Sequence, residues 1–355
     1  MSPAPEIAGQ SIAAGQPLRV IAEMGLNHNG DAALAHRLVD ACADAGVFAI
    51  KLQVFDADQL LVAEAPAPVH VHAASLRDFF RRFELSAPAY ASLVRHAHDR
   101  GLAAIATAFD ADSLAMLDAL SLDAFKIASG DLTHAALIVA ASRTGRPVIL
   151  STGMSEEPEV VAAVEWARAA GASTLGVLHC VSAYPTPDDE QNLRAVGTLA
   201  RLLGLPVGLS DHGREPDAAL LAYAQGATLY ERHVHLAGTD AIDAPVSSTP
   251  DELAALVVRL ARAHQAMGSG ARTAMPAEVP NRVPSRRGLY ARRPITAGHV
   301  LTADDIIALR PATALGAEHI DALVGRASSR ALPAGAAFSP DDLASAGREG
   351  ARGAP

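Results

Sequence analysis

Short apolar runs of the β type alternate with alanine- and leucine-rich stretches of helical character between residues 18 and 234. The eight runs cover residues 18–23, 47–53, 102–107, 124–127, 147–151, 174–180, 206–210 and 228–234. Most of them are apolar on both faces, which is typical of parallel strands covered by helices. Eight strand–helix units suit a closed barrel better than an open sheet, so the pattern predicts an α/β fold of the (β/α)8 TIM-barrel class.

The pattern predicts a second, smaller domain after the barrel. A helix is expected over 251–267, and the following segment, 268–284, is polar and contains three prolines, as a linker does. We expect the barrel domain to cover residues 1–270, the linker 271–284, a compact β-rich domain 285–343 and a disordered tail 344–355. A chain of 355 residues is also longer than one hydrophobic core usually organises.

The connection after the second predicted strand is unusually long, running from residue 55 to residue 84. It carries two prolines, two histidines and a phenylalanine cluster: Pro66, Pro68, His70, His72, Phe79, Phe80 and Phe83. Connections of this length are usually functional or mobile.

Charge and cysteine content narrow the class of protein. The formal net charge is −10 and the basic residues form no run, which argues against nucleic acid as a partner. Cys42 and Cys180 form neither a metal-type pair nor a disulfide framework, as expected in a reducing compartment. The first residues do not resemble a signal peptide, and no apolar stretch approaches the roughly 20 residues that span a bilayer. We therefore expect a cytoplasmic protein with no membrane partner.

Polar residues gather at the carboxyl ends of the predicted strands, where TIM-barrel enzymes carry their reactive groups. These residues are Glu23, Lys51, Gln53, Thr107, Lys126, Ser129, Ser151, Thr152, His179, Ser210, Asp211, His212, Glu231 and His233. Lys51 and Lys126 stand inside apolar runs, and a buried ammonium needs a negative partner. One interpretation is an internal ion pair with Glu23 or Glu231. We favour a bound phosphate or carboxylate, because hydroxyl groups converge on the same end of the barrel.

Two histidines end neighbouring strands and could share a divalent ion. His212 follows the seventh predicted strand and His233 ends the eighth, and adjacent strands lie about 5 Å apart. Glu231, Asp211, Asp243 or water could complete an oxygen-rich shell of the Mn²⁺ or Mg²⁺ type. Packing or hydrogen bonding is the alternative for such a pair. His28, in the segment NHNG, is interpreted as a turn residue.

Three nucleotide-binding and hydrolase motifs are missing from the sequence. It contains no GxGxxG, no GxxxxGK and no GxSxG, which argues against dinucleotide, ATP and serine-hydrolase functions. Small anions and a metal ion remain as ligands.

Several segments of the barrel resemble one enzyme family in order and spacing. They are IAEMGLNHNG, AIKLQVF, ELSAPAYASLVRHAHDRGLAAIATAFD, FKIASGD, PVILSTGMS, LHCVSAYPTP, GLSDH and ERHV. Together they resemble the sialic acid synthase family, with N-acetylneuraminate synthase as its type, over nearly the whole barrel. The later segment RGLYARRPITAGHVLTADDIIALRP resembles the antifreeze-like (SAF) domain that follows the barrel in that family.

The resemblance implies a transferase that condenses phosphoenolpyruvate with an N-acetylated amino sugar, such as N-acetylmannosamine or a related diacetamido sugar. The products are a nonulosonic (sialic-type) acid and phosphate. It also implies a divalent metal, with Mn²⁺ expected and Mg²⁺ or Co²⁺ as alternatives. A homodimer is implied too, in which the SAF domain of one protomer covers the barrel of its partner.

The resemblance assigns roles to individual residues of this sequence. The catalytic set is Glu23, Lys51, Lys126, His212 and His233, of which His212 and His233 are the metal ligands. Phosphoenolpyruvate is assigned to Lys51, Thr107, Lys126, Ser129, Ser151, Ser182 and Ser210. The acceptor sugar is assigned to Gln53, Tyr184, Glu231, Asp243 and Arg310.

The sequence departs from the family pattern in three places, all around the acceptor. The stretch HLAGTDAIDAPVSS replaces an acidic and basic segment with a GPDH-like run, although Asp243 is retained. Ser182 stands where N-acetylneuraminate-forming members often have asparagine, and PATALG replaces the usual PGxG turn after Arg310. The donor half of the site is therefore the firmer expectation, and a variant acceptor sugar is expected.

Three alternatives remain from the sequence. The first is a phosphoenolpyruvate-dependent synthase for a phosphorylated sugar, whose phosphate could meet His70, Arg77, Arg81 and Arg82; these arginines are more simply the solvated face of a helix. The second, a metal-dependent hydrolase, would require more metal ligands at the strand ends. The third is a barrel that binds phosphoenolpyruvate without turnover.

Overall fold

The computed structural model describes residues 4–65 and 75–342. The chain divides into two compact units, Met1–Gly268 and Ser269–Pro355, which are described separately here. The expectations for Pro66, Pro68, His70, His72 and the tail from residue 344 lie outside the described residues.

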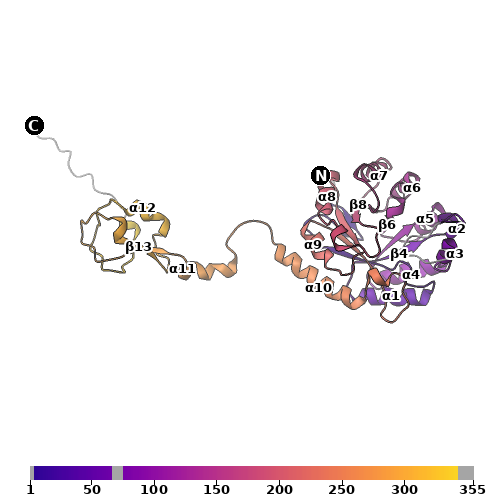
Figure 1. The fold of residues 1–355 in the computed structure, drawn as a ribbon, viewed down its shortest axis with the longest axis horizontal. Coiled ribbons are helices and arrows are strands. Elements are labelled where there is room, and N and C mark those ends of the chain that lie inside the picture. Colours follow the sequence, from indigo (N-terminus) through magenta and orange to yellow (C-terminus); the bar gives the residue numbers. More distant parts are fainter. Residues whose placement is uncertain (1–3, 66–74, 343–355) are drawn as a thin grey trace, which may run out of the picture. The chain divides into compact units, whose positions relative to one another are not determined.

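Eight parallel strands close into a barrel in the described part of the first unit (Figure 1). The strands are β3 (Arg19–Glu23), β4 (Ala49–Val54), β5 (Ala103–Ala108), β6 (Ala124–Ile127), β7 (Val148–Ser151), β8 (Leu175–Cys180), β9 (Val207–Asp211) and β10 (Leu229–Val234). Each pairs with the next in sequence, and β10 pairs with both β9 and β3. Every strand overlaps one of the eight predicted runs, so the barrel prediction is confirmed.

Helices surround the barrel between the strands (Figure 1). The longer ones are α1 (Ala32–Asp44), α4 (Ala87–Asp99), α5 (Ala111–Asp118), α6 (Ala135–Arg143), α7 (Glu157–Ala169), α8 (Ala195–Leu203), α9 (Ala218–Ala224) and α10 (Pro250–Met267). The first residues of α10 show how the local sequence determines where a helix begins. The Thr249 side chain accepts a hydrogen bond from the Glu252 backbone N–H, and the Glu252 carboxylate accepts one from the Thr249 N–H. This capping box, with Pro250 in the first turn, fixes where the helix begins.

Side chains alternate between the two faces of each barrel strand. The outward set packs against the helices and forms the main hydrophobic core. The inward set forms a small apolar layer: Ile21, Ala49, Ala103, Ile105, Ala124, Ile149, Leu178 and Leu229. Ile7 and Ile12 join this layer from the N-terminal segment, where β1 (Glu6–Ile7) and β2 (Gln10–Ser11) pair antiparallel. Sequence analysis did not predict this hairpin, because two-residue strands carry too few positions for a periodic pattern.

The long connection after β4 folds into two short helices in its described parts, α2 (Ala57–Leu60) and α3 (Leu76–Arg81). Phe55, Phe79 and Phe83 form a separate apolar cluster there with Leu26 and Leu76. The connection is therefore anchored by a core of its own beside β4. A two-residue strand, β11 (Ser247–Ser248), pairs in parallel with the end of β10.

The second unit is small and mostly built of turns. Its regular elements are α11 (Arg282–Ser285), β12 (Gly288–Ala291), β13 (Ile306–Leu309) and α12 (Ile320–Leu323), and β12 and β13 pair antiparallel. The predicted linker contains the 3₁₀ helix Pro276–Asn281 as well as most of α11. A core that includes Leu289, Ile306, Leu323 and Phe338 fills the interior of the unit.

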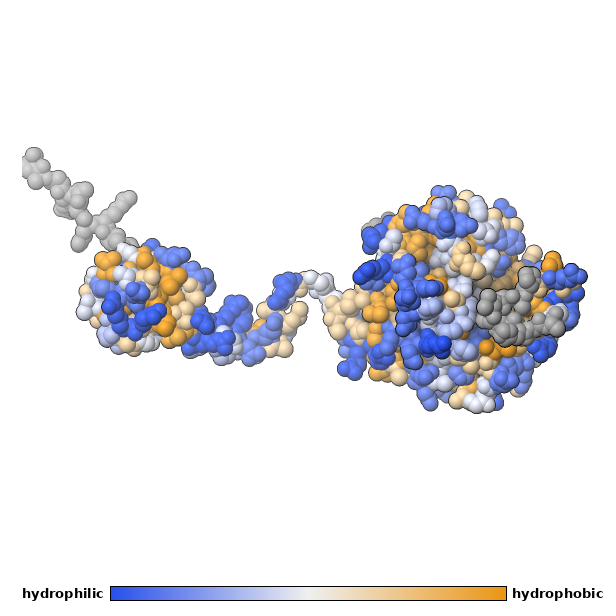
Figure 2. Space-filling model, viewed as in Figure 1, coloured by the Kyte–Doolittle hydropathy of each residue, from blue (hydrophilic) through white to orange (hydrophobic). Residues whose placement is uncertain are grey.

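The visible surfaces of the two units lack the uniformly apolar character of the buried cores. Figure 2 shows hydrophilic and hydrophobic residues mixed over the visible faces of both units, as expected when helices turn their apolar side inward. Across residues 4–65 and 75–342, none of the helices combines the length and apolar character needed to cross a membrane.

Asp305 organises the second unit from its interior. Its carboxylate accepts hydrogen bonds from the backbone N–H and hydroxyl of Thr302, at 2.8 Å each, and from His299 Nε2 at 2.9 Å. Arg293 Nε donates a further hydrogen bond at 2.6 Å. These contacts, with the Thr302 backbone N–H foremost and then His299 and Arg293, hold the pKa of Asp305 well below its usual range.

We predict that Asp305→Asn loosens the second unit selectively. Amide hydrogen exchange in residues 288–338 of the full chain should accelerate by about tenfold or more, because charge-assisted hydrogen bonds are lost. Asp304→Asn, an exposed neighbour, is the matched control and should leave exchange unchanged. Since the pKa of Asp305 is lowered, its contribution is complete above pH about 4 and is lost as the pH falls further. Equal exchange in the two variants would contradict this role.

Candidate active site

The side chains that point into the barrel change from apolar to polar toward the carboxyl ends of the strands. Two residues beyond the last inward apolar position of each strand, or beyond Gly208 in β9, the same face carries Glu23, Lys51, Thr107, Lys126, Ser151, Cys180, Ser210 and Glu231. Strand register places Glu23 beside Lys51, Thr107 beside Lys126, and Ser210 between Cys180 and Glu231. The barrel therefore presents a continuous ring of polar groups at the carboxyl ends of its strands.

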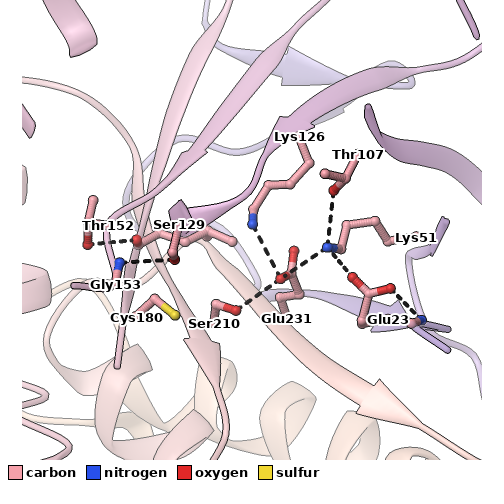
Figure 3. Close-up of polar contacts among 12 residues, drawn as sticks. Glu23, Lys51, Thr107, Lys126, Ser129, Thr152, Gly153, Cys180, Ser210 and Glu231 are labelled. Carbon is pink, nitrogen blue, oxygen red and sulfur yellow. Dashed lines mark hydrogen bonds and ion pairs between the residues drawn. The ribbon is translucent and has the colours of Figure 1, made fainter. Parts of the chain in front are cut away.

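Both lysines of the chain lie in this ring. The sequence contains no lysine other than Lys51 and Lys126, and their exposed fractions are 4% and 2%. Figure 3 shows the two ammonium groups converging on Glu231, whose Oε1 lies 3.5 Å from Lys51 Nζ and 3.4 Å from Lys126 Nζ. Lys51 also forms an ion pair with Glu23. Two buried cations thus face two buried anions, and the ion pairs that the sequence offered as one interpretation are formed.

Hydroxyl groups complete the shell of this charge cluster. Thr107 Oγ1 accepts a hydrogen bond from Lys51 Nζ at 3.4 Å, and Ser210 Oγ donates one to Glu231 Oε1 at 2.9 Å. The Glu23 carboxylate accepts a hydrogen bond from the Gly25 backbone N–H at 2.6 Å. Lys51 and Glu231 thus each have several polar partners, whereas Lys126 pairs with Glu231 alone among the described residues, and Glu231 Oε2 has no hydrogen-bond partner there.

The pKa values of Glu231 and Lys126 are lowered from their ordinary values, whereas that of Lys51 is raised. Burial raises the pKa of Glu231, but the ammonium groups of Lys126 and Lys51 outweigh burial and lower it to about 2. Burial lowers the pKa of both lysines. For Lys51, Glu23 and Glu231 outweigh burial and the pKa rises above 10.5, whereas Lys126 remains below 10.5. Lys126 is therefore the less fully compensated cation and the one with more to gain from an added anion.

A second group of hydroxyls lies beside the charge cluster, after β6 and β7 (Figure 3). Ser129 Oγ accepts a hydrogen bond from the Gly153 backbone N–H at 3.0 Å. A Cβ on residue 153 would collide with the hydroxyls of Ser129 and Ser182, so glycine allows both serines to lie against the backbone at this position. Ser151 is buried at the end of β7. The predicted phosphoenolpyruvate-binding residues of the barrel thus surround one end of it.

His212 and His233 lie side by side at the same end, with ring centroids 5.5 Å apart. His212 Nδ1 lies 3.0 Å from the Val181 carbonyl oxygen, and His233 Nδ1 lies 3.2 Å from Asp243 Oδ2. Gly25 makes the second contact sterically feasible, because a Cβ there would lie 2.7 Å from Asp243 Oδ2. His212 Nδ1 thus faces a carbonyl oxygen at hydrogen-bond distance, whereas His233 Nδ1 lies within ion-pair distance of Asp243 without forming a hydrogen bond to a described residue. With Nδ1 directed at the Val181 carbonyl, Nε2 is the nitrogen of His212 able to bind a metal.

This arrangement fits a divalent cation with few protein ligands. Within the described ranges, no group of three or more His, Cys, Asp or Glu side chains is placed to hold a metal ion. Water or substrate oxygens would have to fill the other positions, as in catalytic metal sites that keep open positions. The lysines and Ser210 all contact Oε1 of Glu231, and its Oε2 has no hydrogen-bond partner among the described residues. The two histidines are therefore the nitrogen candidates for a metal, beside a carboxylate oxygen that is still unpaired.

The predicted acceptor residues are only partly brought together. The Tyr184 ring centroid lies 4.2 Å from that of His212, and Asp243 reaches the same place through His233. Gln53 is two residues beyond Lys51 on the same face of β4 and pairs in register with Thr107. Arg310 belongs to the second unit, where it directly follows β13 and is exposed. Gln53, Tyr184, Glu231 and Asp243 thus belong to the same end of the barrel.

Two of the polar strand ends picked out in the sequence turn away from the site. His179 Nε2 hydrogen-bonds with the Gln191 carbonyl oxygen at 2.8 Å. Asp211 accepts a hydrogen bond from Tyr230 OH at 2.7 Å and pairs with Arg232, so its interpretation as a metal ligand is wrong. Both follow an inward residue by one position, and alternation places them on the outer face. His28 Nδ1 accepts a hydrogen bond from the Gly30 N–H at 3.1 Å, as a turn residue does.

Sequence analysis missed two residues of this region. Cys180 lies in the inward polar ring, with Sγ 3.8 Å from His212 Nδ1 and 3.9 Å from Ser182 Oγ. Asn27, in the segment after β3, donates to the Val234 carbonyl oxygen at 2.8 Å and accepts from the Asp243 backbone N–H at 2.9 Å. It therefore connects this segment to the end of β10 and to the loop that carries Asp243. Its place in the segment IAEMGLNHNG was the available clue.

Known proteins share this fold and sequence pattern. A model of the NeuB family matches residues 38–272, and a model of the SAF domain matches residues 286–344. The N,N'-diacetyllegionaminic acid synthase of Campylobacter jejuni is 32% identical, with 88% of this chain and 96% of that protein covered. The enzyme of the same name from Legionella pneumophila is 33% identical, with 89% and 92% covered.

A solved structure agrees with these relatives. The N-acetylneuraminic acid synthetase of Leptospira borgpetersenii serovar Hardjo-bovis, solved in complex with citrate, superposes with a TM-score of 0.73 at 32% identity. The match covers 79% of this chain and 95% of that structure. Family model, relatives and fold coincide over the same barrel, and the chain belongs to the NeuB family of sialic acid synthases.

Proposed function

We propose that this protein joins phosphoenolpyruvate to the aldehyde of an N-acetylated amino sugar, forming a nonulosonic acid and releasing phosphate. The observation that carries the proposal is the placement of both lysines of the chain inside the barrel, among hydroxyls and beside the histidine pair. Membership of the NeuB family and two relatives named as legionaminic acid synthases support the reaction class.

The donor half of the site follows from electrostatics. Phosphoenolpyruvate carries a phosphate and a carboxylate, and Lys51 and Lys126 are the buried cations available to them. Their present counterions, Glu23 and Glu231, balance them one for one, so a bound anion needs further positive charge. A divalent cation held by His212 and His233, Mn²⁺ in our proposal, would supply that charge and act as a Lewis acid toward the sugar aldehyde.

The residues of the chain provide positioning and proton handling for the reaction. C3 of phosphoenolpyruvate bonds to the aldehyde carbon, water adds its oxygen to C2, and the C2–O bond to phosphate then breaks. Lys126, Ser129 and Ser151 stabilise the departing phosphate charge. Glu23 is proposed to accept a proton from water or a sugar hydroxyl, and its contacts with the Gly25 N–H and Lys51 support this by fixing its carboxylate.

For the acceptor we propose a diacetamido sugar of the legionaminic type. The altered loop before β11 carries Asp243, one of the residues assigned to the acceptor, and the relatives named above support this choice. Arg310 of the second unit is proposed to reach the N-acyl group across a homodimer in which each SAF domain covers the partner's barrel. A cytoplasmic location belongs to the proposal, and the free thiols of Cys42 and Cys180 support it.

A phosphorylated acceptor is not favoured by the contacts around α3. Arg77 and Arg81 both pair with Asp58, at 3.4 Å and 2.6 Å. Arg82 stacks its guanidinium over the rings of Phe79 and Phe83. These arginines are already engaged, so they do not form an open cationic cluster for a sugar phosphate.

The first prediction is metal- and acceptor-dependent phosphate release. Purified protein with Mn²⁺ and phosphoenolpyruvate should release phosphate with the diacetamido sugar that leads to legionaminic acid. Release should be slower with N-acetylmannosamine and undetectable with N-acetylmannosamine 6-phosphate or arabinose 5-phosphate, and EDTA should abolish it. Product mass identifies the nonulosonic acid. Phosphoenolpyruvate binding without phosphate release from any acceptor would instead support a non-catalytic barrel.

The second prediction tests the charge balance of the donor site. Lys126→Met should lower kcat/KM by about 100-fold or more, because Glu231 then repels the incoming phosphate. Glu231→Gln combined with Lys126→Met removes one charge of each sign and is the matched control. Phosphoenolpyruvate affinity, measured by calorimetry, should recover at least partly in the double variant. Affinity no better than in the single variant would argue against the electrostatic explanation.

The third prediction uses the scarcity of lysine. Protein labelled with ¹³C-lysine should give two side-chain Cε resonances, and both should shift when phosphoenolpyruvate is added. On raising the pH, Lys126 should begin to titrate below 10.5 while Lys51 stays protonated, following the directions of their pKa values. Lys126→Arg assigns the signals. If neither resonance shifts when phosphoenolpyruvate is added, phosphoenolpyruvate binds away from the two lysines.

A further inference from the structure

Arg232 is a buried charge on the outer side of the barrel wall. It stands between Glu231 and His233 on β10, and its exposed fraction is 1%. Alternation turns Glu231 and His233 inward and Arg232 outward, between Tyr230 and Val234 of the apolar layer under the helices. A guanidinium in such a layer is costly unless every donor is satisfied, so its partners reveal its role.

The partners of Arg232 are concentrated on the segment that carries His212. Nη1 donates to the Gly213 carbonyl oxygen at 2.6 Å, and Nη2 donates to the Arg214 carbonyl oxygen at 2.9 Å. Nη1 also lies 3.3 Å from Asp211 Oδ2. The planar guanidinium thus grips the chain immediately before and after His212.

Asp211 closes the same network from the other side. It accepts a hydrogen bond from Tyr230 OH at 2.7 Å and another from the Gly213 backbone N–H at 2.8 Å. The fourth contact of the arginine, from Nε to Ser248 Oγ at 3.2 Å, reaches β11, which pairs with β10 beside His233. One side chain therefore connects the backbone segments that carry both histidines.

We propose that Arg232 is a positioning residue that sets the separation of His212 and His233 and so their affinity for a divalent cation. The inference rests on the metal site of the proposed function. A purely structural role in an apolar layer would be filled as well by an apolar side chain. The bidentate grip on two consecutive carbonyls instead fixes the loop orientation, for which the arginine fork is suited.

The test measures binding of Mn²⁺ alone, by electron paramagnetic resonance of the free ion, on the full-length protein. Arg232→Met should raise the Mn²⁺ Kd by about tenfold or more, the usual consequence of losing groups that orient metal ligands. The matched control is Arg146→Met. Arg146 also holds backbone carbonyls, those of Leu120 at 2.8 Å and Asp118 at 3.1 Å, but precedes β7 at the other end of the barrel. The Arg146→Met variant should have a lower melting temperature and an unchanged Mn²⁺ Kd.

The outcomes separate this inference from the proposed function. Wild-type protein that binds no Mn²⁺ would overturn both. Wild-type binding with an unchanged Kd in Arg232→Met, or an equal rise in Arg146→Met, would overturn the positioning role alone. If Arg232→Met does not fold, Arg232→Lys decides, because lysine keeps the charge opposite Asp211 but cannot grip both carbonyls. A Kd raised about threefold or more supports the inference, and a wild-type Kd overturns it.

Discussion

The site depends on one constraint, the need to keep two buried ammonium groups compensated. Lys51 and Lys126 each stand between apolar residues of their strand, and the Glu231 carboxylate lies between the two ammonium groups. Because a buried cation without a partner would cost several kcal/mol, the register that pairs β3 with β4 and β10 with both β3 and β9 is tied to the charges as well as to the core. Packing and chemistry are thus fixed by the same strand alignments.

The alternation of side chains along a strand explains how a packed barrel can also be an active site. The lower inward positions are filled by Ile21, Ile105, Ile149 and their neighbours, and Ile7 joins them from the terminal hairpin. Two residues higher, the same strands offer acids, bases and hydroxyls. The barrel therefore has a sealed apolar floor and a polar opening, and the outward face remains free to carry supporting networks such as that of Arg232.

Much of this could be predicted from the sequence, and the exceptions have identifiable causes. The eight runs were long and apolar enough to locate the strands, and Lys51 and Lys126 drew attention because an apolar run does not normally contain an ammonium. His179 and Asp211 were misjudged because a polar residue near a strand end faces inward or outward according to a shift of one position. Arg232 was noted only as part of the segment ERHV, since two of its four partners are backbone carbonyls, which cannot be recognised in a sequence.

The confinement of lysine to the barrel interior has a consequence for the chemistry of the whole surface. Every other basic side chain among the 29 Lys and Arg residues is an arginine. Amine-directed reagents, acetyl transfer and attachment of ubiquitin-like tags all require an accessible ε-amino group, and the two ε-amino groups of this chain are buried. The positive charges of Lys and Arg on the surface are therefore all guanidinium groups, which amine acylation does not modify. An acylated lysine would report that the barrel had opened.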